Sequence, residues 1–194
     1  VNNKQNDNVQ TGVQTVAATP VQQTEQPQNI GMNDNILPEG DFTVASLSEK
    51  AQIYVNPDAD EYDGLKMVAD CFAEDVDMVT DEKPEIVTDL SKLGGNVIIF
   101  GSIGNNRIID NLISDGKINV DNVKGKWEVF QFDVVEKPVN GVDRALVITG
   151  SDKRGAIYGL FTLSEMMGVS PWVYWADVAP EHKDNVTFKY SELR

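Results

Sequence analysis

The sequence predicts an α+β domain, in which a mixed β-sheet carries helices packed against it. Three patterns predict this class. Apolar residues recur at helical spacing between positions 65 and 79, and a continuous apolar run at 96–100 is typical of an interior strand. In the third pattern, a strand at 144–149 leads through a Gly-Ser-Asp turn into a capped helix. Strands and helices that alternate in this way favour a sheet with helices on its faces.

Residues 1–40 differ in composition from the rest of the chain. They are rich in Gln, Asn, Thr and Val, contain Pro20, Pro27 and Pro38, and show neither helical nor strand periodicity. Such a segment buries too little apolar surface to offset the entropy of ordering. We therefore expect a flexible, disordered linker over 1–40 and one folded domain over 41–194.

The strongest helix of the chain lies in the first half of this domain. It follows a short strand at 52–55, and it ends at Lys83-Pro84, before a second strand at 85–88. One helix face carries the apolar residues Leu65, Val68, Ala69, Phe72, Val76 and Val79. Four acidic residues are expected mostly to face water: Asp70, Glu74, Asp75 and Asp77. Cys71, at the edge of the apolar face, is expected to be a small buried hydrophobe.

The second half continues with an interior strand at 96–100, a glycine turn at 101–106 and a short helix at 107–114. The glycine turn lacks the pattern of a phosphate-binding loop, so a structural tight turn is favoured over a ligand site. Strands at 127–135 and 144–149 are expected to form a hairpin with Asn140-Gly141 at its tip. Ser151 or Asp152 then caps a helix over 153–167, Gly168 ends it, and 186–190 forms a last strand.

Charge and rare residues exclude several classes of function. The formal net charge of −15 argues against nucleic acid and anionic membranes as partners, because phosphate groups are bound by clustered Lys and Arg. No apolar run approaches the ~20 residues that cross a bilayer. One cysteine and one histidine, Cys71 and His182, permit neither a disulfide nor a Cys-based metal cage, and His182 is expected on the surface. The sequence implies no cofactor, no metal site and no catalytic residue, since no spacing of carboxylates places two in one cleft.

Two groups of residues are candidates for binding. Lys153 and Arg154 follow the Gly-Ser-Asp turn, where they could reach an anionic sugar group, although an Arg held by a carboxylate or carbonyls is favoured. Trp172, Tyr174 and Trp175 form an alternating aromatic run after Pro171. This run would have two faces, one for its own domain and one for a neighbour, so a domain interface is preferred over a sugar platform.

The stretch GSDKRGAIYGLFTLSEMMGVSPWVYWADV at 150–178 resembles the N-terminal domain of glycoside hydrolase family 115, the xylan α-1,2-glucuronidases. DNVKGKWE at 121–128 and GVDRALVI at 141–148 support this resemblance, which runs from Ala51 to Val178. Val173 departs from the pattern, because the family usually has a further aromatic residue there. The resemblance implies a fold similar to the second domain of β-hexosaminidases, which has a zincin-like topology without a metal centre.

The resemblance also implies that catalysis belongs to a following (β/α)₈ barrel of the same polypeptide, beyond Arg194. We therefore expect a secreted, noncatalytic accessory domain of an enzyme that removes (4-O-methyl)glucuronic acid from xylan, inactive as an isolated chain. One alternative is an independent carbohydrate-binding module that uses the exposed aromatics. Another, a zincin-type metallohydrolase, lacks the His-Glu-x-x-His motif that it would need.

Overall fold

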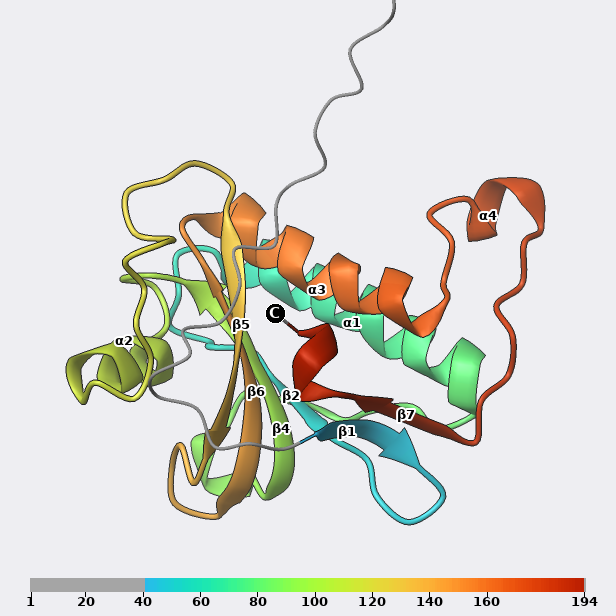
Figure 1. Ribbon diagram of the computed structural model, residues 1–194, viewed down its shortest axis with the longest axis horizontal. Helices are drawn as coiled ribbons and strands as arrows, with labels where there is room; N and C mark the ends of the chain where they lie inside the picture. The colour runs from blue at the N-terminus through green and yellow to red at the C-terminus, as the bar shows by residue number, and fades with distance from the viewer. Residues whose placement is uncertain (1–40, 194) are drawn as a thin grey trace, which may run out of the picture.

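A computed structural model describes residues 41–193, and the linker predicted over 1–40 lies outside these described residues. Figure 1 shows helices grouped over a twisted sheet. Within the described part of the chain, the elements in order are β1 (Phe42–Ser46), β2 (Gln52–Tyr54), α1 (Tyr62–Thr80), β3 (Ile86–Val87), the 3₁₀ turn η1 (Leu90–Lys92), β4 (Gly95–Ser102), α2 (Arg107–Ser114), β5 (Phe130–Glu136), β6 (Val142–Gly150), α3 (Lys153–Met167), α4 (Val173–Ala176), β7 (Asn185–Phe188) and η2 (Tyr190–Glu192). The α+β class is thereby confirmed. The comparison with β-hexosaminidases and the domain boundaries remain predictions.

The main sheet has five strands in the order β3-β2-β4-β6-β5. The first three contacts are parallel, whereas β5 and β6 form an antiparallel hairpin, so the sheet is mixed as predicted. The strand β5 begins at Phe130, three residues later than expected. The reason is local: Glu128 has a positive φ of 56°, and the N–H groups of Glu128 and Val129 bond to the side chains of Asp152 and Ser151.

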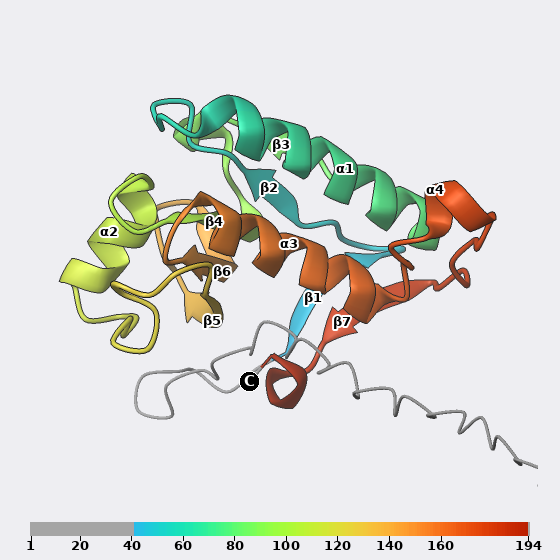
Figure 2. The ribbon, with the colours of Figure 1, turned by 90° about the horizontal axis from the view of Figure 1, so that it is seen from above.

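Strand β4 is covered on both faces, as its continuous apolar run predicts. Ile98 and Phe100 belong to a core beneath α1 and α3, and Val97 and Ile99 belong to a second core beneath α2. All four side chains are fully buried. Figure 2 shows the sheet between α2 on one side and α1 with α3 on the other. The domain is therefore built in three layers.

Helix α1 buries the predicted apolar stripe against α3 and the sheet. Its last turn ends at Asp81, which has a left-handed φ of 57° and donates its N–H to the carbonyl of Asp77. Two expectations about this helix are wrong. Asp75 is buried and does not face water, whereas Cys71 is exposed. Both residues line a cavity between α1 and α3, where the side chains do not fill the space between the helices.

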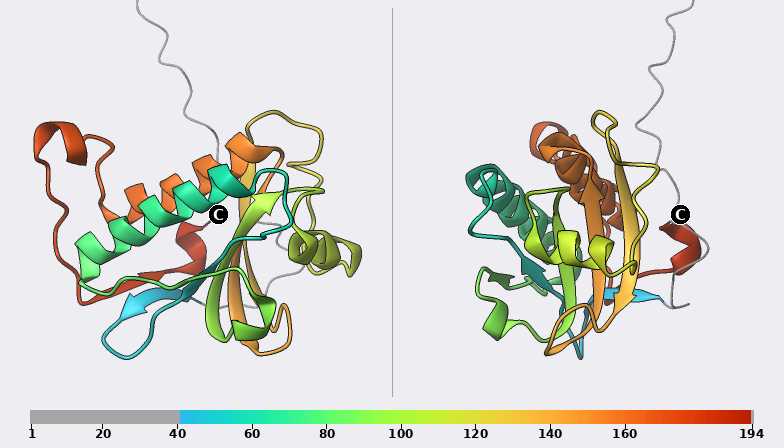
Figure 3. Two further views of the ribbon diagram at one scale, coloured as in Figure 1. Left: turned by 180° about the vertical axis from the view of Figure 1, so that it is seen from behind. Right: turned by 90° about the vertical axis from the view of Figure 1, so that its left-hand side faces the viewer.

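Helix α3 has the ends that the sequence predicts. The Asp152 carboxylate accepts the Gly155 N–H at 2.9 Å, and Gly168 ends the helix with a φ of 99°. Gly155 and Gly159 let the helix lie directly on the sheet. A Cβ on Gly159 would overlap Ile148 and lie 3.1 Å from the Phe130 ring. Figure 3 shows α3 and α1 side by side, with α4 beyond their far ends.

A two-stranded sheet joins the two ends of the described region. β1 pairs antiparallel with β7, so that Phe42 lies opposite Phe188, and both side chains are buried in the α1/α3 core. Leu193 is also fully buried in this core. Both ends of the region therefore contribute to this core. Within residues 41–193, the helices are too short or too polar for a membrane span.

Candidate functional site

The turn before α3 is an internally satisfied structural element. One Asp152 carboxylate oxygen accepts the Gly155 N–H, and the other accepts the Glu128 N–H at 2.7 Å. Ser151 accepts the N–H of Val129 at 3.0 Å. Partial burial raises the pKa of Asp152, but these hydrogen bonds outweigh it, so the pKa lies below its usual value. The turn thus ties the start of β5 to α3.

Lys153 and Arg154 leave this turn in different directions. Lys153 covers Gly64 on α1. Arg154 pairs with the Glu128 carboxylate at 3.0 Å, donates to the Tyr158 hydroxyl at 2.8 Å and lies 5.7 Å from the centre of the Tyr158 ring. A carboxylate therefore holds Arg154, as favoured from the sequence, but its side chain is 63% exposed, which makes the ion pair weak. Whether either residue contacts a sugar remains a prediction.

The aromatic segment after Pro171 differs from the extended run that was expected. Residues 173–176 form α4, a single helical turn, so the side chains do not alternate between two faces. Trp172, Tyr174 and Trp175 are 63%, 71% and 84% exposed. They lie at the opposite end of α3 from Arg154, and the 15 residues of that helix span about 22 Å. The two groups of predicted residues therefore do not form one site (Figure 1).

The glycine turn after β4 is satisfied within the protein. The Asn106 side chain caps α2 by accepting the N–H groups of Ile108 and Ile109. The Asp110 carboxylate accepts the Gly104 N–H at 2.8 Å, in the position that an anionic ligand would need. A polar hollow of about 350 Å³ lies beside this turn, at the carboxyl ends of β2 and β4. Its lining includes Asp58, Asp110 and Arg107.

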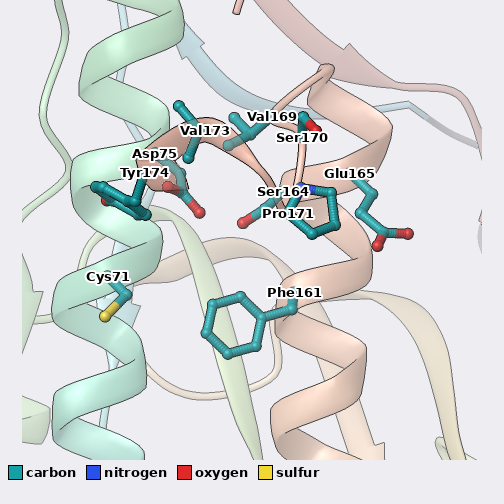
Figure 4. Close-up of a pocket in the computed structure, with 10 residues that line it drawn as sticks. All are labelled: Cys71, Asp75, Phe161, Ser164, Glu165, Val169, Ser170, Pro171, Val173 and Tyr174. Atoms are coloured by element: carbon teal, nitrogen blue, oxygen red, sulfur yellow. The ribbon is translucent and has the colours of Figure 1, made fainter. Parts of the chain in front are cut away.

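A cavity of about 390 Å³ lies between α1 and α3, beneath the segment that leads into α4. Its walls are mostly apolar, and its polar groups include the buried residues Asp75 and Ser164 (Figure 4). Sequence reasoning missed this cavity because the acidic residues of α1 were treated as one solvated group. The signal was present: Asp75 is three residues from Phe72 and four from Val79, so it lies on the buried face.

Burial raises the pKa of Asp75 above its ordinary value, and the nearby Ser164 hydroxyl opposes this without reaching hydrogen-bond geometry. Tyr174 closes one side of the cavity, and its pKa is raised mainly by desolvation and then by the charge of Asp75. Among the described residues, no group of three His, Cys, Asp or Glu side chains is placed to hold a metal ion. The cavity is thus suited to binding through one carboxylate and an apolar wall.

Comparison with known proteins gives a relationship through structure. No family model matches the chain, and no curated protein matches it by sequence. A solved structure that does match is that of BtGH115A, a family GH115 4-O-methyl-α-glucuronidase with specificity for decorated arabinogalactans. The TM-score is 0.58 and the sequence identity 28%, over 79% of this chain and 18% of that one.

The described residues therefore form a glycoside hydrolase-related domain. More specifically, the domain is related to family GH115, which confirms the resemblance carried by residues 150–178. The chain spans less than a fifth of the length of the enzyme that it matches.

Proposed function

We propose that this chain is a noncatalytic domain of a secreted xylan α-1,2-glucuronidase, and that it supports a following (β/α)₈ barrel which removes (4-O-methyl)glucuronic acid. The observation that carries the proposal is the match to the family GH115 enzyme, which covers most of this chain and 18% of the enzyme. In an enzyme of which such a domain makes up 18%, ample length remains for a separate catalytic barrel. We propose secretion because an enzyme that acts on a polymeric polysaccharide has to reach it outside the cell.

The two buried carboxylates, Asp75 and Asp133, are not placed as a catalytic pair. Glycoside hydrolysis commonly uses two carboxyl groups about 5–10 Å apart that flank one bond. Asp75 faces the cavity between α1 and α3. Asp133 lies on β5, in alternation with Phe132 and Val134, and therefore faces the other side of the sheet. The sheet separates the two carboxylates, so they cannot flank a single glycosidic bond.

The exposed aromatics around α4 are proposed to contact the barrel. Three large, exposed rings lie on one short segment, and exposed apolar groups that gather in this way mark interaction sites. Aromatic residues are enriched in interfaces because they bury much area for few rotatable bonds. Burial of each ring would contribute about 1.5–3 kcal/mol to domain docking, before entropy is subtracted.

The proposed activity is tested with two forms of the protein, the 194-residue chain and a longer form that includes the polypeptide encoded after Arg194. Release of 4-O-methylglucuronic acid is measured from glucuronoxylan and from decorated arabinogalactan, since the matched enzyme is specific for the latter. We expect release by the longer form and none by the chain alone at any pH. Release by the isolated chain would overturn the noncatalytic role.

The proposed interface is tested by replacing Trp172 and Trp175 with Ser. The matched control is Trp127→Ser, because Trp127 is 80% exposed but lies near the start of α3, far from α4. We expect the double variant to lower the melting temperature of the longer form only, and Trp127→Ser to leave both forms unchanged. Saturable quenching of Trp fluorescence by xylo-oligosaccharides, abolished by the double variant, would instead favour the independent carbohydrate-binding module.

A further inference from the structure

The cavity between α1 and α3 has an unusual polar floor. Asp75 on α1 and Ser164 on α3 are 5% and 3% exposed, and Figure 4 shows their side chains pointing toward each other across the gap. The Ser164 hydroxyl oxygen is buried and has no hydrogen-bond partner among the described residues. Within residues 41–193, no ion pair joins Asp75 to a basic side chain. Buried polar groups are nearly always paired, so this arrangement calls for a partner.

The rest of the cavity is suited to an apolar group. Phe161 and Tyr174 supply aromatic rings, and Val169, Pro171 and Val173 supply aliphatic surface. Figure 4 shows the Phe161 ring between the two helices, while the Glu165 carboxylate points away from Asp75. Its volume of about 390 Å³ lies within the range of small-molecule sites, roughly 300–1,000 Å³.

The charge around the cavity indicates whether a bound ligand would be an anion or a cation. Asp75 carries the charge inside the cavity, and Glu165 adds a second carboxylate to its lining. The two basic residues nearest along the chain, Lys83 and Lys66, are already paired, with Glu74 and Asp70 respectively. A carboxylate ligand such as a glucuronate would therefore meet repulsion and an unpaired acceptor. A cation would gain a charge-assisted hydrogen bond, and aromatic rings beside it would add attraction.

We propose that this cavity binds an organic cation, an ammonium or guanidinium group on an apolar stem, with Asp75 as its counter-ion and Ser164 as a second acceptor. The stem lies between Phe161 and Tyr174. The site can be tested without the proposed glucuronidase role, because all of its lining lies within this chain, on α1, on α3 and in residues 169–174, although Tyr174 is shared with the proposed barrel contact. The cation has two possible sources, a free amine and a Lys or Arg side chain of another polypeptide segment.

The proposal is tested by titrating the 194-residue chain with benzylammonium, and with benzyl alcohol and benzoate as neutral and anionic matches. Binding is followed by NMR shifts of α1 and α3 amides. A second readout is protection of Cys71, the single cysteine of the chain, from a thiol reagent, because Cys71 is exposed and lines the cavity. We expect saturable binding of benzylammonium, weaker binding of the alcohol and none of benzoate.

The key variant is Asp75→Asn, which should weaken benzylammonium binding about ten- to a hundredfold, the loss of one charge-assisted hydrogen bond. Asp77→Asn on the same helix is the matched control, because Asp77 does not line the cavity, and it should leave binding unchanged. Should Asp75→Asn fail to fold, Ser164→Ala removes an unpartnered hydroxyl and should weaken binding several-fold without unfolding the domain.

Two further titrations distinguish the sources of the cation. Nα-acetyl-lysine amide and Nα-acetyl-arginine amide mimic a protein side chain. If these bind more tightly than benzylammonium and depend equally on Asp75, a side chain is the natural occupant; the reverse order points to a free amine. Failure of all three cations to bind, equal binding of benzoate, or binding that survives both Asp75→Asn and Ser164→Ala would overturn the proposal.

Discussion

Asp133 offers a direct test of how burial controls the stability of this domain. It lies on β5 with 1% of its surface exposed, and its carboxylate accepts a hydrogen bond of 2.7 Å from the side-chain amide of Gln131. The same amide donates to the carbonyl of Asn119 at 2.9 Å, so its orientation is fixed. Burial raises the pKa of Asp133 to about 6, and the Gln131 hydrogen bond opposes this only in part.

The sign of the effect on stability follows from proton binding. With an ordinary pKa of 3.8 in the unfolded chain and about 6 in the folded domain, the folded state retains the proton over this window. The contribution of Asp133 to stability is therefore greatest below pH 3.8 and is lost as the pH rises through 6. A difference of about two pH units, at about 1.4 kcal/mol per unit, corresponds to roughly 3 kcal/mol lost above the window.

Asp133→Asn removes the charge and keeps the shape of the protonated acid. We expect the variant to match the wild type in free energy of unfolding near about pH 4, and to exceed it by up to roughly 3 kcal/mol near about pH 8. The measurement is urea unfolding at a series of pH values. The control is Asp143→Asn, an exposed residue of the same hairpin. A difference that stays constant with pH, or a variant that is less stable at every pH, would refute the reasoning.

Three further predictions concern packing, charge and the ends of the domain. Gly159→Ala should destabilise the domain by about 1–3 kcal/mol in urea unfolding, because the added Cβ overlaps the sheet; an unchanged midpoint would mean that α3 shifts freely. Arg154→Ala should leave the melting temperature unchanged, because its ion pair is exposed; a clear drop would show a structural role that the contacts do not explain. Removal of residues 1–40 should not change the melting temperature, whereas further deletion through β1 should cost about 3 kcal/mol or more, because β1 buries Phe42 against β7; a large effect of the first deletion would contradict this.

The resemblance within residues 150–178 was sufficient to identify the class of protein, and the structural match supports it. The relative positions of the candidate binding residues could be predicted less well from the sequence. The sequence predicts the helix over 153–167 that separates Arg154 from Trp175, but only the structure shows that residues 173–176 form a short helical turn beyond its far end. Helical continuity fixes that separation, because a rigid helix of 15 residues cannot bring its two ends together.

The sequence by itself determined the elements whose signals are local. The apolar stripe of α1, the continuous run of β4 and the Asp152 and Gly168 ends of α3 depend on neighbours within a few residues, and each is found where it was predicted. Tertiary structure decided the rest. Helical spacing places Asp75 on the apolar face of α1, but the packing of α3 beside α1 is what buries it. Residues 173–176 form a helical turn in place of the extended run expected from the sequence. The cavity that Asp75 lines depends on contacts between distant segments, which no local pattern of residues specifies.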